Sequence, residues 1–125
     1  MKTTLSILHN QASDWLRDLV FYTEELGILT ERLDEVRMYN TGKEIDTQTR
    51  YFQNKFVALR QQTDVLVREI MAREKKVEKT TEEMPDRIDE IIRVVDDQLF
   101  DRMALLAKGV AATRYEFNRF LSKVM

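Results

Sequence analysis

The stretch that decides the fold runs from Leu5 to Val36 and reads LSILHNQASDWLRDLVFYTEELGILTERLDEV. Mostly apolar residues recur in this stretch at alternating intervals of three and four positions: Leu5, Leu8, Ala12, Trp15, Leu19, Tyr22, Leu26, Leu29, Leu33 and Val36. Residues at these intervals lie on one face of an α-helix, so the heptad pattern predicts one long helix packed lengthwise against others. Gly27 lies inside it, either as a tolerated outward-facing glycine or as a point where another helix approaches closely.

Two further segments repeat the pattern less regularly. The first consists of Ile45, Thr49, Phe52, Phe56, Leu59, Thr63, Leu66, Ile70 and Val77, and the second of Ile88, Ile92, Val95, Leu99, Met103, Leu106, Val110, Thr113, Phe117, Phe120 and Val124. Short breaks separate the three segments. Thr41 and Glu44 have the spacing of a helix-initiating capping box, as do Thr80 and Glu83, and Pro85 suits only the first turn of a helix.

These signals predict an all-α fold, a long up-down-up antiparallel three-helix bundle that resembles a coiled coil. We expect a single domain over residues 1–125, with helices at about 3–39, 42–79 and 82–124. The predicted layers at the two ends are Leu33, Val36, Phe52, Phe56, Phe117 and Phe120, and Leu8, Trp15, Ile70, Val77, Ile88 and Ile92. Residues 1–42 carry 4 basic and 7 acidic residues, residues 43–80 carry 9 and 6, and residues 81–125 carry 7 and 9. A basic middle helix favours contact of that helix with both neighbours.

Composition limits the partners. The 125 residues include 20 basic and 22 acidic ones, and this balance gives no reason to expect nucleic acid or an anionic membrane as a partner. No run of about 18 apolar residues occurs, so we expect no membrane span. The sequence has no Cys, and its first ten residues lack the apolar core of a signal peptide. We therefore expect a cytoplasmic protein.

The sequence offers few residues for catalysis or for cofactor binding. His9 is its only histidine, which is too few for a di-iron or zinc site, and we expect an ordinary surface residue. Adjacent acidic residues such as Glu24 and Glu25 diverge by about 100° on a helix and predict a solvated face. The basic residues Arg68, Arg73, Lys75, Lys76 and Lys79 suit the end of the second helix, where the dipole favours positive charge. We predict no catalytic, cofactor-binding or metal-binding residues, and no enzyme.

The first helix has more apolar residues than one packing face needs. Leu16, Val20, Phe21 and Ile28 lie off the main pattern and form our candidate interface, because contiguous exposed apolar surface usually marks an interaction site. A wide core-facing stripe would also account for them. The leading prediction is a protein partner or self-association as a homodimer, which would complete a slender core. A symmetric contact would need Arg17 or Arg32 opposite Asp14, Asp18 or Glu24.

The leading interpretation is a non-enzymatic structural or protein-interaction bundle. The alternative is a bundle that binds a small apolar ligand at its aromatic end, in a cavity lined by Tyr51, Phe52, Phe56, Phe117 and Phe120.

Several short segments resemble a family of proteins. They are Trp15-Leu16, residues 21–26, residues 32–36 and residues 52–56. In these segments the chain resembles small helical proteins of unknown function from Bacteroidetes-type bacteria. The resemblance covers the first helix and the first half of the second, and it implies no activity or residue role.

Overall fold

Three long helices make up the described part of the chain. The computed structural model describes residues 2–40 and 42–124, and the side chains within them except those of residues 2–8, 88 and 90–96. Helix α1 spans Lys2–Tyr39, α2 spans Lys43–Glu83, a short 3₁₀ turn η1 spans Pro85–Arg87, and α3 spans Ile88–Val124. The described residues contain no strand, so the all-α prediction is confirmed.

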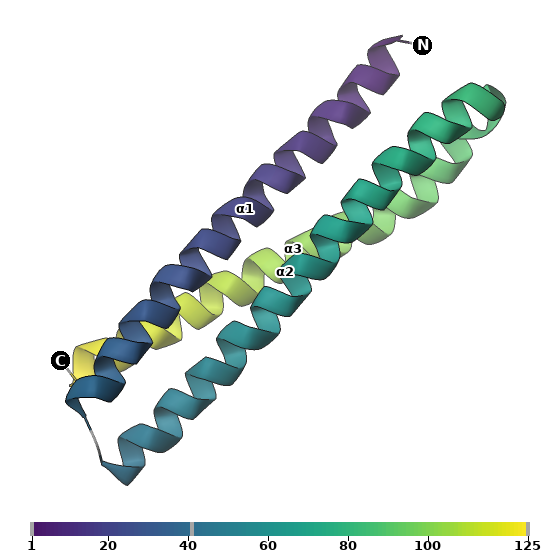
Figure 1. Cartoon of the computed structure of the whole chain (residues 1–125). Helices are drawn as coiled ribbons and strands as arrows, with labels where there is room; N and C mark the ends of the chain where they lie inside the picture. Colours follow the sequence, from purple (N-terminus) through teal and green to yellow (C-terminus); the bar gives the residue numbers. More distant parts are fainter. Residues whose placement is uncertain (1, 41, 125) are drawn as a thin grey trace.

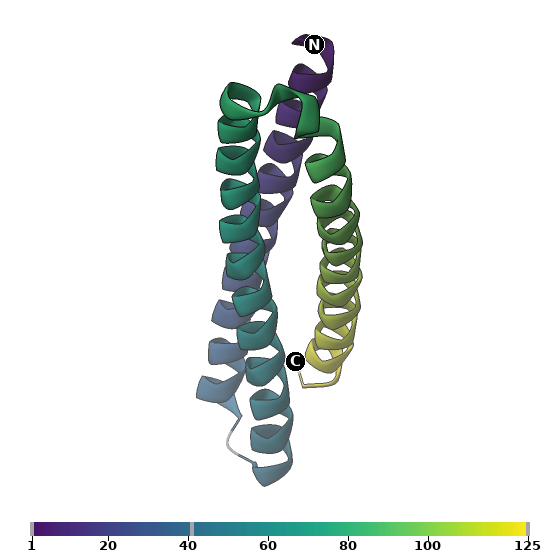
Figure 2. The ribbon, with the colours of Figure 1, turned by 90° about the vertical axis from the view of Figure 1, so that its right-hand side faces the viewer.

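The helices run up, down and up along one another (Figure 1). The connection between α2 and α3 lies at the same end as the amino terminus, and the carboxyl terminus lies near the connection between α1 and α2 (Figure 1). Helix α2 packs closely against both α1 and α3, whereas α1 and α3 approach one another less closely. Figure 2 shows α2 and α3 side by side with α1 behind them. The predicted contact of the basic middle helix with both neighbours is confirmed.

The core follows the heptad pattern wherever side chains are described. Leu19, Leu26 and Leu33 of α1 are essentially inaccessible, and so are Ile70 of α2 and Phe117 of α3. The core also includes threonines, because their hydroxyls bond to the helix itself. The hydroxyl of Thr63 donates to the carbonyl of Leu59 at 2.8 Å, and that of Thr49 donates to the carbonyl of Asp46 at 2.9 Å. Leu5, Leu8, Ile88, Ile92 and Val95 lie outside the described side chains.

The predicted aromatic layer forms as expected. The ring centroids of Phe52 and Phe117 lie 5.2 Å apart, those of Phe56 and Phe117 5.3 Å, and those of Phe52 and Phe120 5.2 Å. Leu33 and Val36 of α1 are buried at the same end. At the other end, Trp15 is buried and the guanidinium of Arg73 lies 5.5 Å from its ring centroid.

The second connection differs from the predicted one. Thr80 and Glu83 both lie inside α2, which continues four residues beyond its expected end, and α3 begins only at Ile88. The helix ends at Glu83 with Met84 as its C-cap, because Pro85 disfavours helical geometry in the residue that precedes it. The Thr80 spacing therefore does not start a helix.

The first connection also differs from the predicted one. Helix α2 begins after Gly42, which occupies the N-cap position without a side-chain hydrogen bond. The expected cap, Thr41, lies outside the described residues.

Candidate functional site

Ion pairs and hydrogen bonds join the helices at several levels. Glu69 of α2 pairs with Arg102 of α3. The hydroxyl of Tyr51 in α2 donates to Glu116 of α3 at 2.8 Å. The sequence predicted neither contact. These contacts fix which level of α2 lies beside which level of α3.

Among the described residues, one ion pair joins α1 to α3. Arg114 donates to Oε1 of Glu25 at 2.5 Å, and the Glu25 side chain is only 14% exposed. Its second oxygen, Oε2, is buried and has no hydrogen-bond partner. The sequence predicted that Glu24 and Glu25 share a solvated face, which holds for Glu24 and is wrong for Glu25. A buried carboxylate is retained only when it is paired, and Arg114 supplies that partner.

The candidate interface on α1 is largely exposed. Val20 is 56% exposed, Phe21 57% and Ile28 51%, and we call these three residues the outer α1 surface. Phe21 and Ile28 are separated by seven residues, or about two helical turns, and lie on one line along the helix. Leu16 does not belong to this surface, because it packs partly buried against the core. The core accounts for Leu16 and leaves the other three residues exposed.

A shallow groove of about 290 Å³ lies between this surface and α3. It is lined by Phe21, Glu24, Glu25, Ile28, Leu29, Arg32, Arg114 and Asn118. Its apolar floor is the buried Leu29, and Phe21 and Ile28 form its outer edge on α1. The groove is consistent with the looser approach of α1 to α3.

The charges on α1 disfavour symmetric pairing of two copies through this surface. In an antiparallel pair that sets Phe21 against the partner's Ile28, Arg17 meets the partner's Arg32. A parallel pair in register sets every residue against its own copy. Both arrangements bring like charges together, which is unfavourable.

One symmetric register that pairs opposite charges loses apolar contact. If the two-fold axis passes through Ile28, Arg32 meets the partner's Glu24, as the predicted dimer requires. The same register, however, sets Phe21 against the partner's Glu35. One large apolar residue then faces a carboxylate, which disfavours this register.

The aromatic end is packed instead of hollow. Phe52, Phe56, Phe117 and Phe120 are each at most 6% exposed and contact one another, while Tyr51 contacts Phe52 edge-on from the surface. A groove of about 380 Å³ lies outside these rings, and its lining includes Gln48, Glu116, Arg119 and Lys123. The predicted cavity residues therefore lie together, but their rings occupy the space between them.

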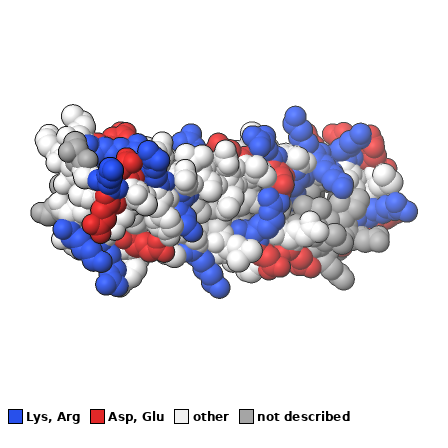
Figure 3. All heavy atoms as spheres, turned by 90° about the horizontal axis from the view of Figure 1, so that it is seen from below, with Lys and Arg blue, Asp and Glu red and all other residues white. Residues whose placement is uncertain are grey.

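The basic residues near the end of α2 do not form one surface. Arg73 is 3% exposed and lies against Trp15, whereas the other four are exposed. Because α2 continues to Glu83, these residues precede its last turn, which has no basic residue. The proposed dipole role is therefore wrong. Figure 3 shows acidic and basic side chains at both ends of the visible face.

The described residues offer little for metal chemistry. Nδ1 of His9 lies 3.4 Å from Oε2 of Glu74, and its side chain is 72% exposed. Within the described ranges, no group of three histidine, aspartate or glutamate residues could hold a metal ion. No described helix has a stretch long and apolar enough to cross a membrane.

Comparisons with known proteins give no relative. No protein-family model, curated protein or solved structure matches the chain.

Proposed function

We propose that this chain is a non-enzymatic, cytoplasmic interaction bundle that binds another protein along the outer α1 surface. The observation that carries the proposal is the exposure of two large apolar side chains, Phe21 and Ile28, on one line beside an apolar-floored groove. Covering the exposed half of each of these two side chains would contribute about 1 kcal/mol to the free energy of binding. Contiguous apolar surface of this kind is typical of sites that bind proteins.

The charges that flank the surface indicate which kind of partner helix would complement it. Glu24 and Arg32 are exposed, and neither forms an ion pair with another described residue of the chain. An amphipathic helix with a basic residue for Glu24 and an acidic residue for Arg32 would complement both. Its apolar face would cover Phe21 and Ile28.

A photo-crosslinking experiment tests the proposal. A benzoyl-phenylalanine at position 21 should form a covalent adduct with a distinct protein in the cells that make this chain. The matched control carries the same group at Tyr115, which is 63% exposed on α3. An adduct specific to position 21, lost when Ile28→Glu is added, supports the proposal.

Three results contradict it. Adducts at position 21 that contain only this chain would assign the surface to self-association, as the sequence first predicted. Equal labelling at positions 21 and 115, or no adduct at either, would mean that the outer α1 surface has no specific partner.

A further inference from the structure

Each helix has two flanks, one on either side of its buried face, and the grooves show which neighbour each flank faces. On α1, Glu25 and Ile28 line the groove toward α3, whereas Gly27 and Thr30 line a groove of about 340 Å³ toward α2. On α2, one flank lines the groove toward α1 with Gln53, Val57 and Arg60, and the other lines the groove toward α3 with Ala58, Gln62 and Val65.

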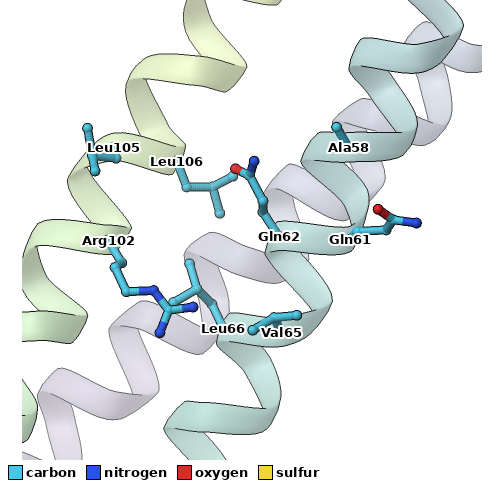
Figure 4. Close-up of a pocket in the computed structure, with 8 residues that line it drawn as sticks. All are labelled: Ala58, Gln61, Gln62, Val65, Leu66, Arg102, Leu105 and Leu106. Carbon is cyan, nitrogen blue, oxygen red and sulfur yellow. The ribbon is translucent and has the colours of Figure 1, made fainter.

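Figure 4 shows the flank of α2 that faces α3. Gln62 and Leu106 point toward one another across the groove between these helices, which has a volume of about 480 Å³, and Arg102 extends from α3 toward Leu66. The part of the lining that α2 supplies is uncharged and consists of Ala58, Gln61, Gln62, Val65 and Leu66.

The buried faces alone allow two arrangements of the three helices. Once α1 and α2 form a hairpin, α3 can pack on either side of it, and both arrangements bury the same heptad residues. They differ in the flanks that meet, because the flank of α1 that faces α3 in one arrangement faces α2 in the other. Residues on the flanks therefore decide which arrangement forms.

Glu25 and Arg114 fit only the observed arrangement, in which they form an ion pair. In the other arrangement, Glu25 would face the uncharged flank of α2 that carries Gln62 and Val65. Arg114 would face the opposite flank of α2, where Arg60 carries a like charge. Glu25 would then be buried without a cation beside it, which is strongly unfavourable for a carboxylate.

We propose that the ion pair of Glu25 with Arg114 selects the side of the α1–α2 hairpin on which α3 packs. The Glu25 side chain is 14% exposed, and its Oε2 has no hydrogen-bond partner among the described residues. Burial of this carboxylate is therefore costly, and the pair adds little to stability. A buried ion pair of this kind can still specify one arrangement, because removing its partner is so unfavourable.

The other ion pair between helices selects less strongly. Glu69 and Arg102 would also separate in the second arrangement, but their side chains are 43% and 42% exposed, and exposed pairs contribute little. The observed arrangement sets the outer α1 surface beside α3. The inference does not rest on the proposed function, because it concerns the packing of a single chain.

Cysteine crosslinking distinguishes the two arrangements, since the chain has no cysteine of its own. Arg32 and Asn118 line the same groove between α1 and α3, so Arg32→Cys with Asn118→Cys reports the observed arrangement. Arg32→Cys with Ala58→Cys reports the other one, in which these flanks of α1 and α2 meet. All three positions are exposed. In the otherwise unchanged chain, a short bismaleimide at low protein concentration should link the first pair within one molecule and not the second.

Removing the ion pair should remove the selection. The apolar double variant Glu25→Leu, Arg114→Leu should remain helical by circular dichroism and should link positions 32 and 58 at least about tenfold more than the unchanged chain. The neutral double variant Glu25→Gln, Arg114→Gln should do the same, and it provides the test if the leucine variant aggregates. Its yield should rise further in Arg114→Gln with Gln62→Arg, because this change offers Glu25 a cation on the other flank.

The exposed ion pair between α2 and α3 provides the matched control. The double variant Glu69→Leu, Arg102→Leu removes two opposite charges in the same way, and it should link only positions 32 and 118. Exposed charges of this kind contribute little to the choice of arrangement.

Urea unfolding separates a pair that selects an arrangement from one that stabilises it. Arg114→Leu alone leaves the Glu25 carboxylate without its cation and should lower the urea midpoint by about 0.5–1 M. The apolar double variant should have a midpoint at least as high as wild type, because it removes the buried carboxylate as well.

The proposal is overturned if neither the apolar nor the neutral double variant links positions 32 and 58 more than the unchanged chain does. It is also overturned if the control variant at Glu69 and Arg102 links them equally well, or if the unchanged chain links both pairs of positions to the same extent.

Discussion

Replacing Gly27 by alanine should stabilise the protein. The residue lies within α1 and has no positive φ angle, and a Cβ added there would have no neighbouring atom within 4 Å. Of the two explanations open from the sequence, the tolerated glycine is confirmed and close approach by another helix is wrong. A glycine inside a helix costs about 0.5–1 kcal/mol relative to alanine. Since no clash offsets it, nearly all of this should appear as added stability.

The gain can be measured by urea unfolding at fixed protein concentration. With a typical slope of about 2 kcal/mol per molar urea, the midpoint should rise by about 0.3–0.5 M. Circular dichroism reports the helices, and Trp15, the only tryptophan, reports the core end near Arg73. Coincident midpoints from the two signals would establish that unfolding is two-state.

Gly109→Ala is the matched control. It removes the same backbone freedom, but its added Cβ would lie 3.2 Å from Cδ2 of Leu59, which must move to make room. The gain at Gly109 should therefore be smaller than at Gly27. A loss of stability in Gly27→Ala, or a larger gain in Gly109→Ala, would refute the assignment of which glycine faces open space.

Three further predictions concern the core and the titrating groups. Leu19→Ala should lower the free energy of unfolding by about 2–5 kcal/mol, because Leu19 is fully buried in mid-helix; a loss below 1 kcal/mol would contradict this. His9→Gln should change it by less than about 0.5 kcal/mol, since the contact with Glu74 is exposed, and a loss exceeding that of Leu19→Ala would reverse our assignment of the α1 faces. Burial and nearby carboxylates raise the pKa of Tyr22, and a hydrogen bond to a carboxylate raises that of Tyr51, both above 10.0. The stability that these two shifts contribute is complete below pH 10 and should be lost as the pH rises through the folded-state pKa values. Replacing both tyrosines by phenylalanine should therefore weaken the pH dependence of the free energy of unfolding above pH 10, and an unchanged pH dependence would contradict this.

Much of the fold could be predicted because the heptad pattern determines which face of each helix is buried. Every described member of the first pattern from Ala12 to Val36 is buried or, for Tyr22, half-buried. Even Arg73 could have been placed, since it falls three residues after Ile70 and four before Val77. Its charge argued for the surface, but the Trp15 ring accepts its guanidinium inside the bundle.

The helix ends were less predictable, because the signals there are ambiguous. A threonine followed three residues later by a glutamate occurs inside helices as well as at their starts, and Thr81 donates its hydroxyl to the carbonyl of Val77 within α2. Pro85 gave the better signal, since it acts on the residue before it whatever the neighbouring sequence.

The candidate surfaces depend on the level at which one helix lies beside another along the bundle. The apolar periodicity of the sequence does not determine this level. Sliding a helix by seven residues, about 10.5 Å, preserves its apolar face and changes every polar neighbour. The contacts of Glu25 with Arg114 and of Glu69 with Arg102 select one level, and neither pair is close in the sequence. Only at that level does Arg102 line a groove together with Leu66, Leu105 and Leu106. Counting apolar residues therefore found the exposed residues of α1, which lie close in sequence, and missed the groove between α2 and α3, whose lining comes from two helices.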